Sequence, residues 1–297
     1  MNKHKKKFSW GQLILNIFFI LTSITYVLPM LLVISISFSF EQSIRDFGYR
    51  FIPSVWSTEA YRLIFKNPAQ IIDSYKTTII FSFVGTALAV LVTALLAYPL
   101  SRPSYKLKRP LTWYIFVTML FSGGLVPQYI INSKYLHLDN TMWIYILPGV
   151  VSAWNVIVIR TFFQGLPIEM TESAKIDGAR EIVIFFRIIF PLSTPVLASI
   201  GFMTLVAKWN DWNTALIYIT DTRLYSLQYM LQRILNEIEF VRQAVESGKS
   251  VGESANVIPT ENVRYAMAML AAGPMLIVFP FFQKYFAKGM TVGAVKG

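Results

Sequence analysis

The sequence predicts an all-α membrane protein with six transmembrane helices and both termini in the cytoplasm. Hydrophobic residues occupy 55% of the 297 positions, charged residues occupy only 14%, and the mean hydropathy is +0.51. A soluble domain carries roughly 25% charged residues, so this chain has too few to cover a water-facing surface. Six spans of about 20 apolar residues need about 120 positions, which the chain supplies. A soluble enzyme, a secreted domain and a disordered protein are therefore disfavoured.

Metal and thiol chemistry are also disfavoured. The chain has no cysteine, which excludes disulfides, thiolate zinc sites, iron–sulfur clusters and cysteine nucleophiles. Its two histidines, His4 and His137, have no partner at metal-ligand spacing. We therefore expect neither a catalytic residue nor a metal site.

Six apolar segments account for the predicted spans. They cover Leu13–Phe40, about Thr77–Leu100, Leu111–Ile131, Thr141–Phe163, about Ile188–Ile219 and Val263–Phe282. The first follows a lysine-rich leader and invites comparison with a signal peptide. It is too long for that role and lacks a small-x-small cleavage site, so we expect a retained span. Between the first two spans, Ser57 and the following residues through Ile64 predict a capped helix at the membrane interface.

The distribution of basic residues predicts the orientation. Fifteen of the 27 Lys and Arg residues lie in the leader, residues 101–110, residues 160–187 and the C-terminal tail. Short basic segments next to spans stay in the cytoplasm, and six spans place all four of these segments on one side. The net charge of +11 is therefore explained by topology, and no nucleic-acid partner is expected.

The polar segment between the fourth and fifth spans is the candidate functional site. Pro167 marks a helix start, Thr171–Ile176 has helix-forming residues, and Gly178 can adopt the positive φ that ends a helix. A second amphipathic helix then leads to Pro191, where the next span is expected to begin. An ordinary loop on the lipid headgroups is the alternative. The acidic residues of the segment suit an anionic surface poorly, which favours a protein partner.

The spacing within this segment resembles the signature of a known family. Glu172–Ala174 is followed after three residues by Gly178, and nine residues later by Ile188–Pro191. The membrane subunits of binding-protein-dependent ABC importers have a similar Glu-Ala-Ala, Gly and Ile-x-Leu-Pro signature. Asp177–Ala179 is similar to the carbohydrate-uptake branch, which includes the maltose permease subunits. Ser173 stands where the signature has Ala and Phe190 where it has Leu; the first keeps roughly the size and the second the apolar character.

The resemblance extends over residues 60–297 and implies the type I transmembrane-domain fold of these importers. On this basis residues 1–74 hold the cytoplasmic leader, the first span and an extracytoplasmic segment. Residues 75–297 form the permease domain, with a coupling loop at 164–190 and a C-terminal tail at 283–297. Lys76-Thr77 stands where the family usually has Asn-Thr.

The resemblance implies that the loop forms coupling helices that dock in a groove of a cytoplasmic ATPase. Gly178 is expected to permit close approach to that partner. Glu172 and Asp177 are expected to cap backbone amides or to pair with basic groups of the ATPase. For Glu172, simple solvation of an exposed face stays open as an alternative. The residues assigned to ATPase coupling are Glu172, Ser173, Ala174, Asp177, Gly178, Ala179 and Pro191.

A polar cluster in the fifth span is the candidate substrate path. Lys208 lies roughly 20 Å beyond Pro195 along a helix, in the outer half of the bilayer. Ionisable residues within a span are candidates for function, and Lys208 and Asp211 could pair on one helix face. Indole rings suit the apolar faces of sugars, but anchoring at the aromatic belt is the alternative. The candidate residues are Lys208, Trp209, Asn210, Asp211, Trp212 and Asn213.

The predicted function is a membrane-spanning subunit of an ATP-driven importer of sugars, with an oligosaccharide favoured. No Walker A sequence occurs in the chain, so we expect no bound cofactor and place ATP and Mg on separate ATPase subunits. The expected partners are a second homologous permease, two cytoplasmic ATP-binding subunits and an extracytoplasmic solute-binding protein or lipoprotein. The lipid bilayer surrounds the complex. A homodimeric permease remains open.

Two other functions compete with this prediction. An ion-coupled secondary transporter of a polar solute would need midplane carboxylates and an inverted repeat, and neither is clear. An intramembrane enzyme would need a nucleophile–base or metal cluster, for which Lys208 and Asp211 are poor candidates.

Overall fold

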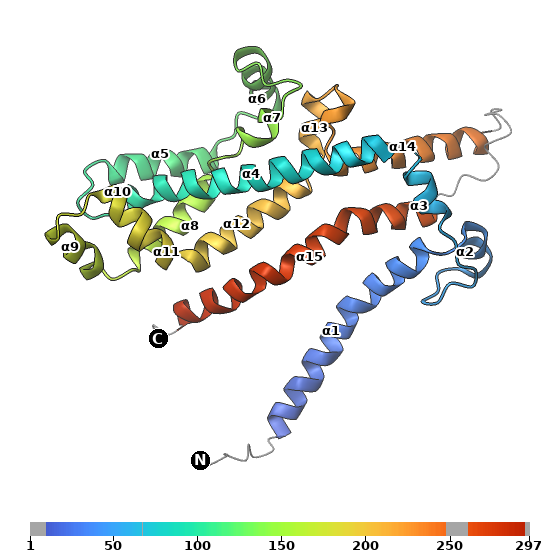
Figure 1. The fold of residues 1–297 in the computed structure, drawn as a ribbon, viewed down its shortest axis with the longest axis horizontal. Coiled ribbons are helices and arrows are strands. Elements are labelled where there is room, and N and C mark those ends of the chain that lie inside the picture. Colours follow the sequence, from blue (N-terminus) through green and yellow to red (C-terminus); the bar gives the residue numbers. More distant parts are fainter. Residues whose placement is uncertain (1–9, 67, 248–260, 295–297) are drawn as a thin grey trace. The chain divides into compact units, whose positions relative to one another are not determined.

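The computed structural model describes residues 10–66, 68–247 and 261–294, and these are helical (Figure 1). Within them the only strand-like feature is an isolated antiparallel bridge between Ser39 and Trp56. The all-α prediction is therefore confirmed for the part of the chain described. The chain divides into two compact units: unit 1 comprises residues 1–67 and 234–273, and unit 2 comprises residues 68–233 and 274–297.

Unit 1 is built around the long apolar helix α1. Its helices are α1 (Trp10–Ser37), α2 (Glu41–Phe47), α3 (Glu59–Ile64), most of α14 (Leu227–Glu246) and the first part of α15 (Glu261–Ala294). The hydroxyls of Thr22, Ser23 and Thr25 each donate to a carbonyl one turn earlier in α1, at 2.7–3.0 Å. These hydrogen bonds satisfy the three hydroxyls within the helix itself, as is needed where a helix faces lipid and no water is present.

A buried carboxylate joins α2 to the start of α15 within unit 1. The Glu41 side chain is 4% exposed, and its Oε2 accepts the backbone N–H groups of Glu261 and Asn262 at 3.1 and 3.2 Å. Arg45, one turn later in α2, pairs with Oε1 at 3.2 Å. The first N–H groups of a helix have no partner within that helix, so Glu41 acts as a helix cap supplied from a distant part of the chain.

Unit 2 contains the candidate site. Its helices are α4 (Pro68–Ser101), α5 (Lys108–Leu120), α6 (Leu125–Ile130), the π-helical η1 (Ile131–Tyr135), α7 (Trp143–Ile146), α8 (Ala153–Gln164), α9 (Glu169–Ile176), α10 (Glu181–Ile184), the π-helical η2 (Phe185–Ile189), α11 (Phe190–Leu192), α12 (Thr194–Trp209), α13 (Asn213–Tyr218), the 3-10 turn η3 (Thr222–Leu224), the start of α14 and the second part of α15.

Helix α4 is the centre of unit 2, because α8 and α12 both pack along it. Its buried face is lined by small residues, including Gly85, Ala89, Ala94 and Ala97. Small side chains let neighbouring helix backbones approach closely in a membrane. A core cluster then joins the C-terminal end of α4 to α8, α10 and η2 through Ala97, Ile159, Phe163, Ile184 and Phe185.

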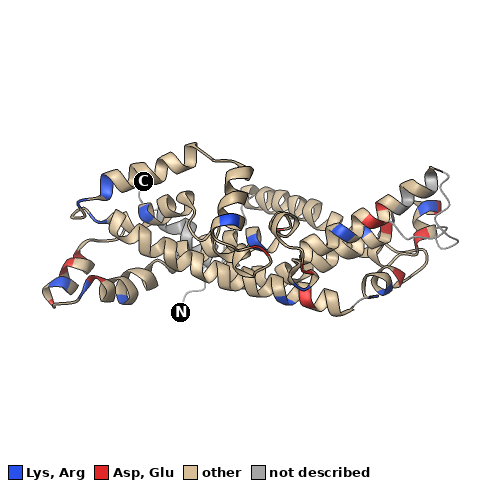
Figure 2. Ribbon diagram, turned by 90° about the horizontal axis from the view of Figure 1, so that it is seen from above, with Lys and Arg blue, Asp and Glu red and all other residues tan. Residues whose placement is uncertain are grey.

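The membrane spans are less regular than the sequence suggests. Three helices are long and apolar enough to cross a bilayer: α1, α4 and the Glu261–Gln283 part of α15. Two further candidates are bent pairs: α5 with α6 and η1, at 113°, and α10–α11 with α12, at 78°. The predicted fourth span is divided into the short helices α7 and α8, which do not pass the same test. Charged residues lie mainly near helix ends, and most of each long helix is uncharged (Figure 2).

Three helical features were missed by the sequence analysis. Helix α4 begins nine residues before the predicted second span, and α2 and α14 lie in segments expected only to be polar. Helix α14 is amphipathic, and apolar side chains such as Leu227, Met230, Leu231 and Ile238 form its buried face. That spacing follows the helical repeat and was available in the sequence.

The capping role of Glu41 predicts a loss of stability in Glu41→Ala. The substitution leaves two buried N–H groups at the start of α15 without their acceptor, which costs about 1–2 kcal/mol. Thermal unfolding of the detergent-purified protein measures it, with Asp46→Ala, an exposed carboxylate of the same helix, as the control. Equal melting temperatures for the two variants would contradict the assignment.

Candidate functional site

Helix α9 ends in a turn that requires glycine. The Gly178 N–H donates to the Lys175 carbonyl at 3.0 Å, and the Ala179 N–H donates to the Ala174 carbonyl at 2.9 Å. This is the hydrogen-bond pattern of a Schellman cap. Gly178 has φ +78°, and a Cβ at this position would meet no atom within 4 Å. The backbone conformation, and not crowding by other atoms of the chain, therefore favours glycine at this position. The prediction that the helix ends at Gly178 is confirmed.

The signature residues divide between the body of unit 2 and the solvent. Ala174 and Ala179 pack against the core cluster that contains Ile184 and Phe185. Glu172 and Ser173 are exposed. Positions 174 and 179 need a small residue such as alanine, because a larger side chain at either position would push α9 away from α10.

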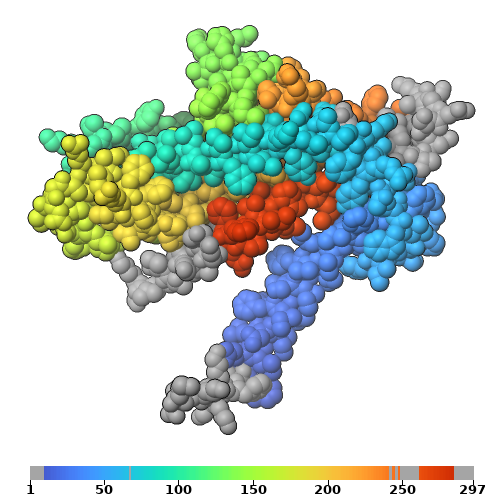
Figure 3. Space-filling model, viewed as in Figure 1, coloured from blue at the N-terminus to red at the C-terminus, as the bar shows by residue number. Residues whose placement is uncertain are grey.

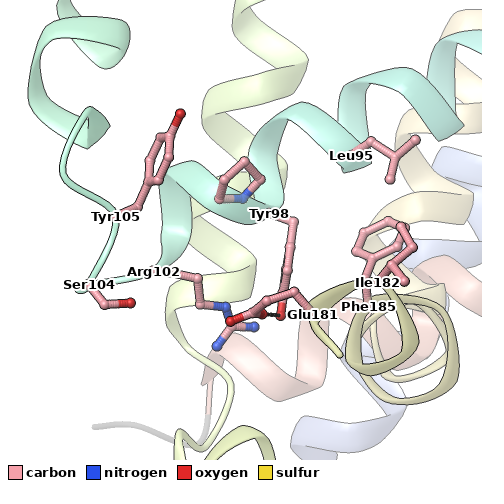
Figure 4. A pocket seen from close by; sticks show the side chains of 9 residues that line it. Leu95, Tyr98, Arg102, Ser104, Tyr105, Glu181, Ile182 and Phe185 are labelled. Atoms are coloured by element: carbon pink, nitrogen blue, oxygen red, sulfur yellow. Dashed lines mark hydrogen bonds between the residues drawn. The ribbon is translucent and has the colours of Figure 1, made fainter. Parts of the chain in front are cut away.

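A carboxylate holds α9 and α10 against α4. Glu181 Oε1 lies 2.6 Å from Lys175 Nζ, and Glu181 Oε2 accepts the Tyr98 hydroxyl at 2.6 Å (Figure 4). The Arg102 guanidinium lies over the Tyr98 ring, with Cζ 4.6 Å from its centroid. Glu181, Tyr98 and Arg102 border a cavity of about 430 Å³ that Tyr105 also lines. A second polar contact joins Arg102, just after α4, to α9: its Nη1 donates to the Thr171 hydroxyl at 3.5 Å. The coupling loop is therefore tied to the end of a long membrane helix.

Glu181 is ionised at neutral pH. Burial raises its pKa, but hydrogen bonds from Lys175 and Tyr98, together with the charges of Lys175 and Arg102, outweigh burial. The pKa of Glu181 consequently lies below its ordinary value of 4.5. A carboxylate with a lowered pKa stabilises the folded state above its ordinary pKa, and the contribution is lost as the pH falls through the lowered value.

Helix α9 lies at one end of unit 2 (Figures 1 and 3), and several of its apolar side chains are exposed. Ile176 is 87% exposed, and Ile168 and Met170 are each 42% exposed. The side chains of Glu172 and Asp177 have no hydrogen bond or ion pair within the ranges that the structure describes. The expectation that they cap amides of this chain is therefore wrong, because Asp177 sits at the C-terminal end of α9, where N–H groups are already paired. Pairing with an ATPase stays a prediction.

The segment expected to begin the fifth span is bent rather than straight. Pro191 is exposed and belongs to the short helix α11, and the 78° bend follows it at Ser193. Helix α12 begins at Thr194, with Pro195 in its first turn, where the missing N–H of proline costs nothing. The amphipathic helix leading to Pro191 consists of α10 and the π-helical η2 rather than one regular helix.

The structure separates the two ionisable residues of the predicted substrate path. Lys208 Nζ donates to the Tyr145 carbonyl at 2.7 Å, and its aliphatic stem lies against Gly85 of α4. Asp211 follows the end of α12 and accepts the Thr214 N–H at 3.0 Å, at the start of α13. Because the helix ends between them, Lys208 and Asp211 do not share one helix face and form no ion pair within 4 Å in the described part of the chain, although the charge of Asp211 still acts on Lys208.

The other residues of this cluster lie in different surroundings. Trp209 is 1% exposed, so it neither anchors at the aromatic belt nor lines an open path in this structure. Asn210 donates to the Val206 carbonyl at 2.9 Å, which uses its amide within α12. Trp212 and Asn213 are exposed. Asn210 is exposed as well, so three of the six candidates have the accessibility that a substrate contact needs, while Lys208 requires a local rearrangement.

Comparisons with known proteins decide the family. The chain is 35% identical over 280 residues to a polygalacturonan/rhamnogalacturonan transport system permease of Bacillus subtilis, which covers 94% of this chain and 96% of that protein. It is 38% identical to protein LplC of the same organism, over 91% of this chain and 90% of the other. The chain belongs to the carbohydrate-type permeases of ABC transporters. No family model matches it.

The fold agrees with this assignment. A bacterial ABC transporter involved in the import of the acidic polysaccharide alginate contains a chain that superposes with a TM-score of 0.78 at 23% identity. The superposition covers 96% of this permease and all of that chain. The permease is accordingly a multi-pass protein of the bacterial cell membrane.

The sequence analysis missed three residues that support the site. Tyr98 and Arg102, one helical turn apart at the end of α4, carry the loop contact and the cation–π contact. Their spacing next to the basic loop was a usable signal. Gly85 makes room for Lys208, and its position in the middle of an apolar span was the signal for a close helix contact.

The cap of α9 predicts graded effects at Gly178. Gly178→Val forces a β-branched residue into the left-handed region, whereas Gly178→Asn tolerates that region. We expect the valine variant to lose co-purification with the ATPase and the asparagine variant to retain most of it. If both variants lose the ATPase equally, close approach to the partner, rather than backbone strain, sets the requirement for glycine.

The Glu181 contact predicts partial uncoupling when it is removed. In Glu181→Gln and Tyr98→Phe we expect substrate imported per ATP hydrolysed to fall about two- to tenfold, since the hydrogen bonds to this charge hold the loop. The control is Glu169→Gln, an exposed carboxylate of the same loop. In the unmodified permease the ratio should stay constant between pH 6 and 8, because Glu181 remains ionised. An unchanged ratio in both variants would contradict a positioning role.

Proposed function

We propose that the chain is one of two membrane subunits of an ATP-driven, binding-protein-dependent importer of oligosaccharides. It would cross the membrane six times with both termini in the cytoplasm. The three long helices and the two bent pairs would account for five crossings, and we assign the sixth to the divided segment α7–α8. The basic segments at 101–110 and 160–187 then lie in the cytoplasm, as the positive-inside rule requires.

The coupling loop carries this proposal. Helix α9 presents the exposed side chain of Ile176, is closed by the turn at Gly178, and is tied to α4 through Glu181. A protruding helix with an apolar end and a rigid attachment is suited to docking in a groove of a moving partner. Closure of two ATPase subunits on ATP would push α9, and Glu181 would pass the displacement to Tyr98 and α4.

The complex would contain several other chains. A second homologous permease completes the translocation path, and two ATP-binding subunits hold ATP and Mg. An extracytoplasmic solute-binding protein or lipoprotein delivers the sugar. Residues 41–74 and 220–262 would form its docking surface, although 248–260 fall outside the described residues. The permease itself hydrolyses nothing and binds no cofactor or nucleic acid.

The substrate class rests on the relatives and on Lys208. A relative at 35% identity is named for polygalacturonan and rhamnogalacturonan transport, which supports a saccharide longer than one unit. A galacturonan carries carboxylates, and Lys208 would supply a matching cation if its bond to the Tyr145 carbonyl is released. Trp212 and Asn213 would add an aromatic face and an amide.

Co-purification from the native cell in mild detergent tests the assembly. We expect a second permease and an ATPase to accompany the unmodified chain, and the ATPase to be lost with Gly178→Glu. Binding-protein-stimulated ATP hydrolysis with a panel of oligosaccharides then identifies the substrate. If the chain purifies alone in both cases, the importer proposal fails and an ion-coupled carrier must be considered.

The proposed role of Lys208 predicts a selective effect of Lys208→Met. Methionine keeps an aliphatic stem against Gly85 but removes the charge. We expect the KM for a uronate-containing oligosaccharide to rise about tenfold, as for loss of one charge-assisted hydrogen bond, with a smaller change for a neutral one. Equal changes for both substrates would assign Lys208 to packing of α12 on α4.

A further inference from the structure

A groove between α5 and α8 has an apolar floor and a cationic end. It has a volume of about 380 Å³ and is lined by Thr112, Trp113, Phe116, Ile157 and Arg160. Trp113 is 67% exposed and Phe116 40%, and their rings meet edge to face at 5.9 Å. Every residue of α5 is at least partly exposed, so this side of unit 2 is open to whatever surrounds it.

Arg160 is held in place at the groove by one of its nitrogens. Its Nε donates to the Leu100 carbonyl at the end of α4, at 3.0 Å. Its two terminal nitrogens make no hydrogen bond within the described part of the chain, which leaves a fork of donors beside the groove. A guanidinium with two parallel N–H donors matches the geometry of a phosphate group.

The two chain segments that form the groove carry basic residues and no acidic ones. Arg102, Lys106, Lys108 and Arg109 lie in the loop before α5 or in its first turn. Neither residues 101–120 nor residues 151–164 contain an Asp or Glu. The positive end of the α5 helix dipole lies at Lys108 and adds to this field. The field is complementary to an anion and repels a basic partner.

We propose that this groove binds one anionic phospholipid of the cytoplasmic leaflet. The phosphate would lie at Arg160 and the basic start of α5, and an acyl chain would lie along Phe116 and Ile157. Basic pockets between membrane helices on the cytoplasmic side recognise anionic headgroups, and tryptophan favours this depth of the bilayer. The leaflet assignment rests on the proposed orientation of residues 101–110.

This lipid would act next to the coupling loop. Arg160 joins α8 to α4 at Leu100, two residues after Tyr98, which meets α10 through Glu181. Ile159 and Phe163 of α8 lie in the core cluster that contains Ile184 of α10. A headgroup on Arg160 would thus brace the same helix ends that hold the loop.

A photoactivatable phosphatidylglycerol, carried in membranes of the reconstituted importer complex, tests the proposal. We expect cross-links in the peptides that contain Thr112–Phe116 and Ile157. Arg160→Gln should reduce them about fivefold, the effect of one basic residue at a membrane surface. Arg187→Gln, an exposed cytoplasmic arginine away from the groove, is the control. Arg160→Lys, with the melting temperature, separates loss of charge from loss of fold.

Four outcomes would overturn the site. Equal cross-linking by photoactivatable phosphatidylcholine would mean nonselective surrounding lipid. Full competition by free glycerol 3-phosphate would mean a soluble phosphate ligand. Cross-links to these peptides from the second permease, in place of the lipid, would mean a subunit interface. An unchanged yield of phosphatidylglycerol cross-links in a folded Arg160→Gln variant would mean that Arg160 does not bind the headgroup.

The leaflet is tested separately. The chain has no cysteine, so Ser104→Cys introduces its single thiol. Labelling from the cytoplasmic side supports the assignment. Labelling only from outside overturns both the leaflet and the proposed topology, whereas loss of selectivity for phosphatidylglycerol overturns the lipid site alone.

Discussion

The two oxygens of one carboxylate provide the shortest polar link between α9 and the membrane helices. Glu181 Oε1 holds Lys175 within the loop, and Oε2 holds Tyr98 of α4, while Ala174 and Ala179 pack on the core beside them. Because α4 packs on both α8 and α12, displacement of the loop reaches three helices. An exposed ion pair of this kind contributes little to stability. Its importance lies in fixing the direction in which α9 can move.

The bilayer imposes a second constraint, because backbone groups at breaks in its helices still need partners. Asp211 meets this need by accepting the Thr214 N–H where α12 gives way to α13. Ser152 accepts the Asn155 N–H in the same way at the start of α8. Gly124, with φ +80°, allows the sharp turn between α5 and α6. Each break is therefore built from a short polar residue or glycine that satisfies or relaxes the local backbone.

Much of the architecture could be predicted because hydropathy and helix-ending residues act locally. The apolar runs located α1, α4 and α15, and Gly178 correctly ended α9. The division of the fourth span into α7 and α8, and the bend at Ser193, depend on tertiary packing that no local pattern reports. The same is true of Glu41, whose partners at the start of α15 are about 220 positions away in sequence.

The candidate substrate path shows where sequence reasoning reaches its limit. Lys208 and Asp211 have helical spacing, yet the helix ends at Trp209 and sends them to different partners. Whether two polar residues of a span meet depends on the direction in which each side chain points, and the packing of the neighbouring helices sets that direction. From the sequence, Trp209 could contact sugar, face lipid or pack in the core; in the structure it is buried in the core.

The contact between Gly85 and Lys208 has a consequence for how such permeases can be recombined. An ideal Cβ on Gly85 would lie 2.9 Å from Lys208 Cε, closer than two carbon atoms tolerate. A side chain at position 85 therefore requires the flexible end of Lys208 to move, which would also disturb its bond to the Tyr145 carbonyl. In a chimera that takes α4 from one parent and α12 from another, the residue at position 85 decides where the lysine amine can lie.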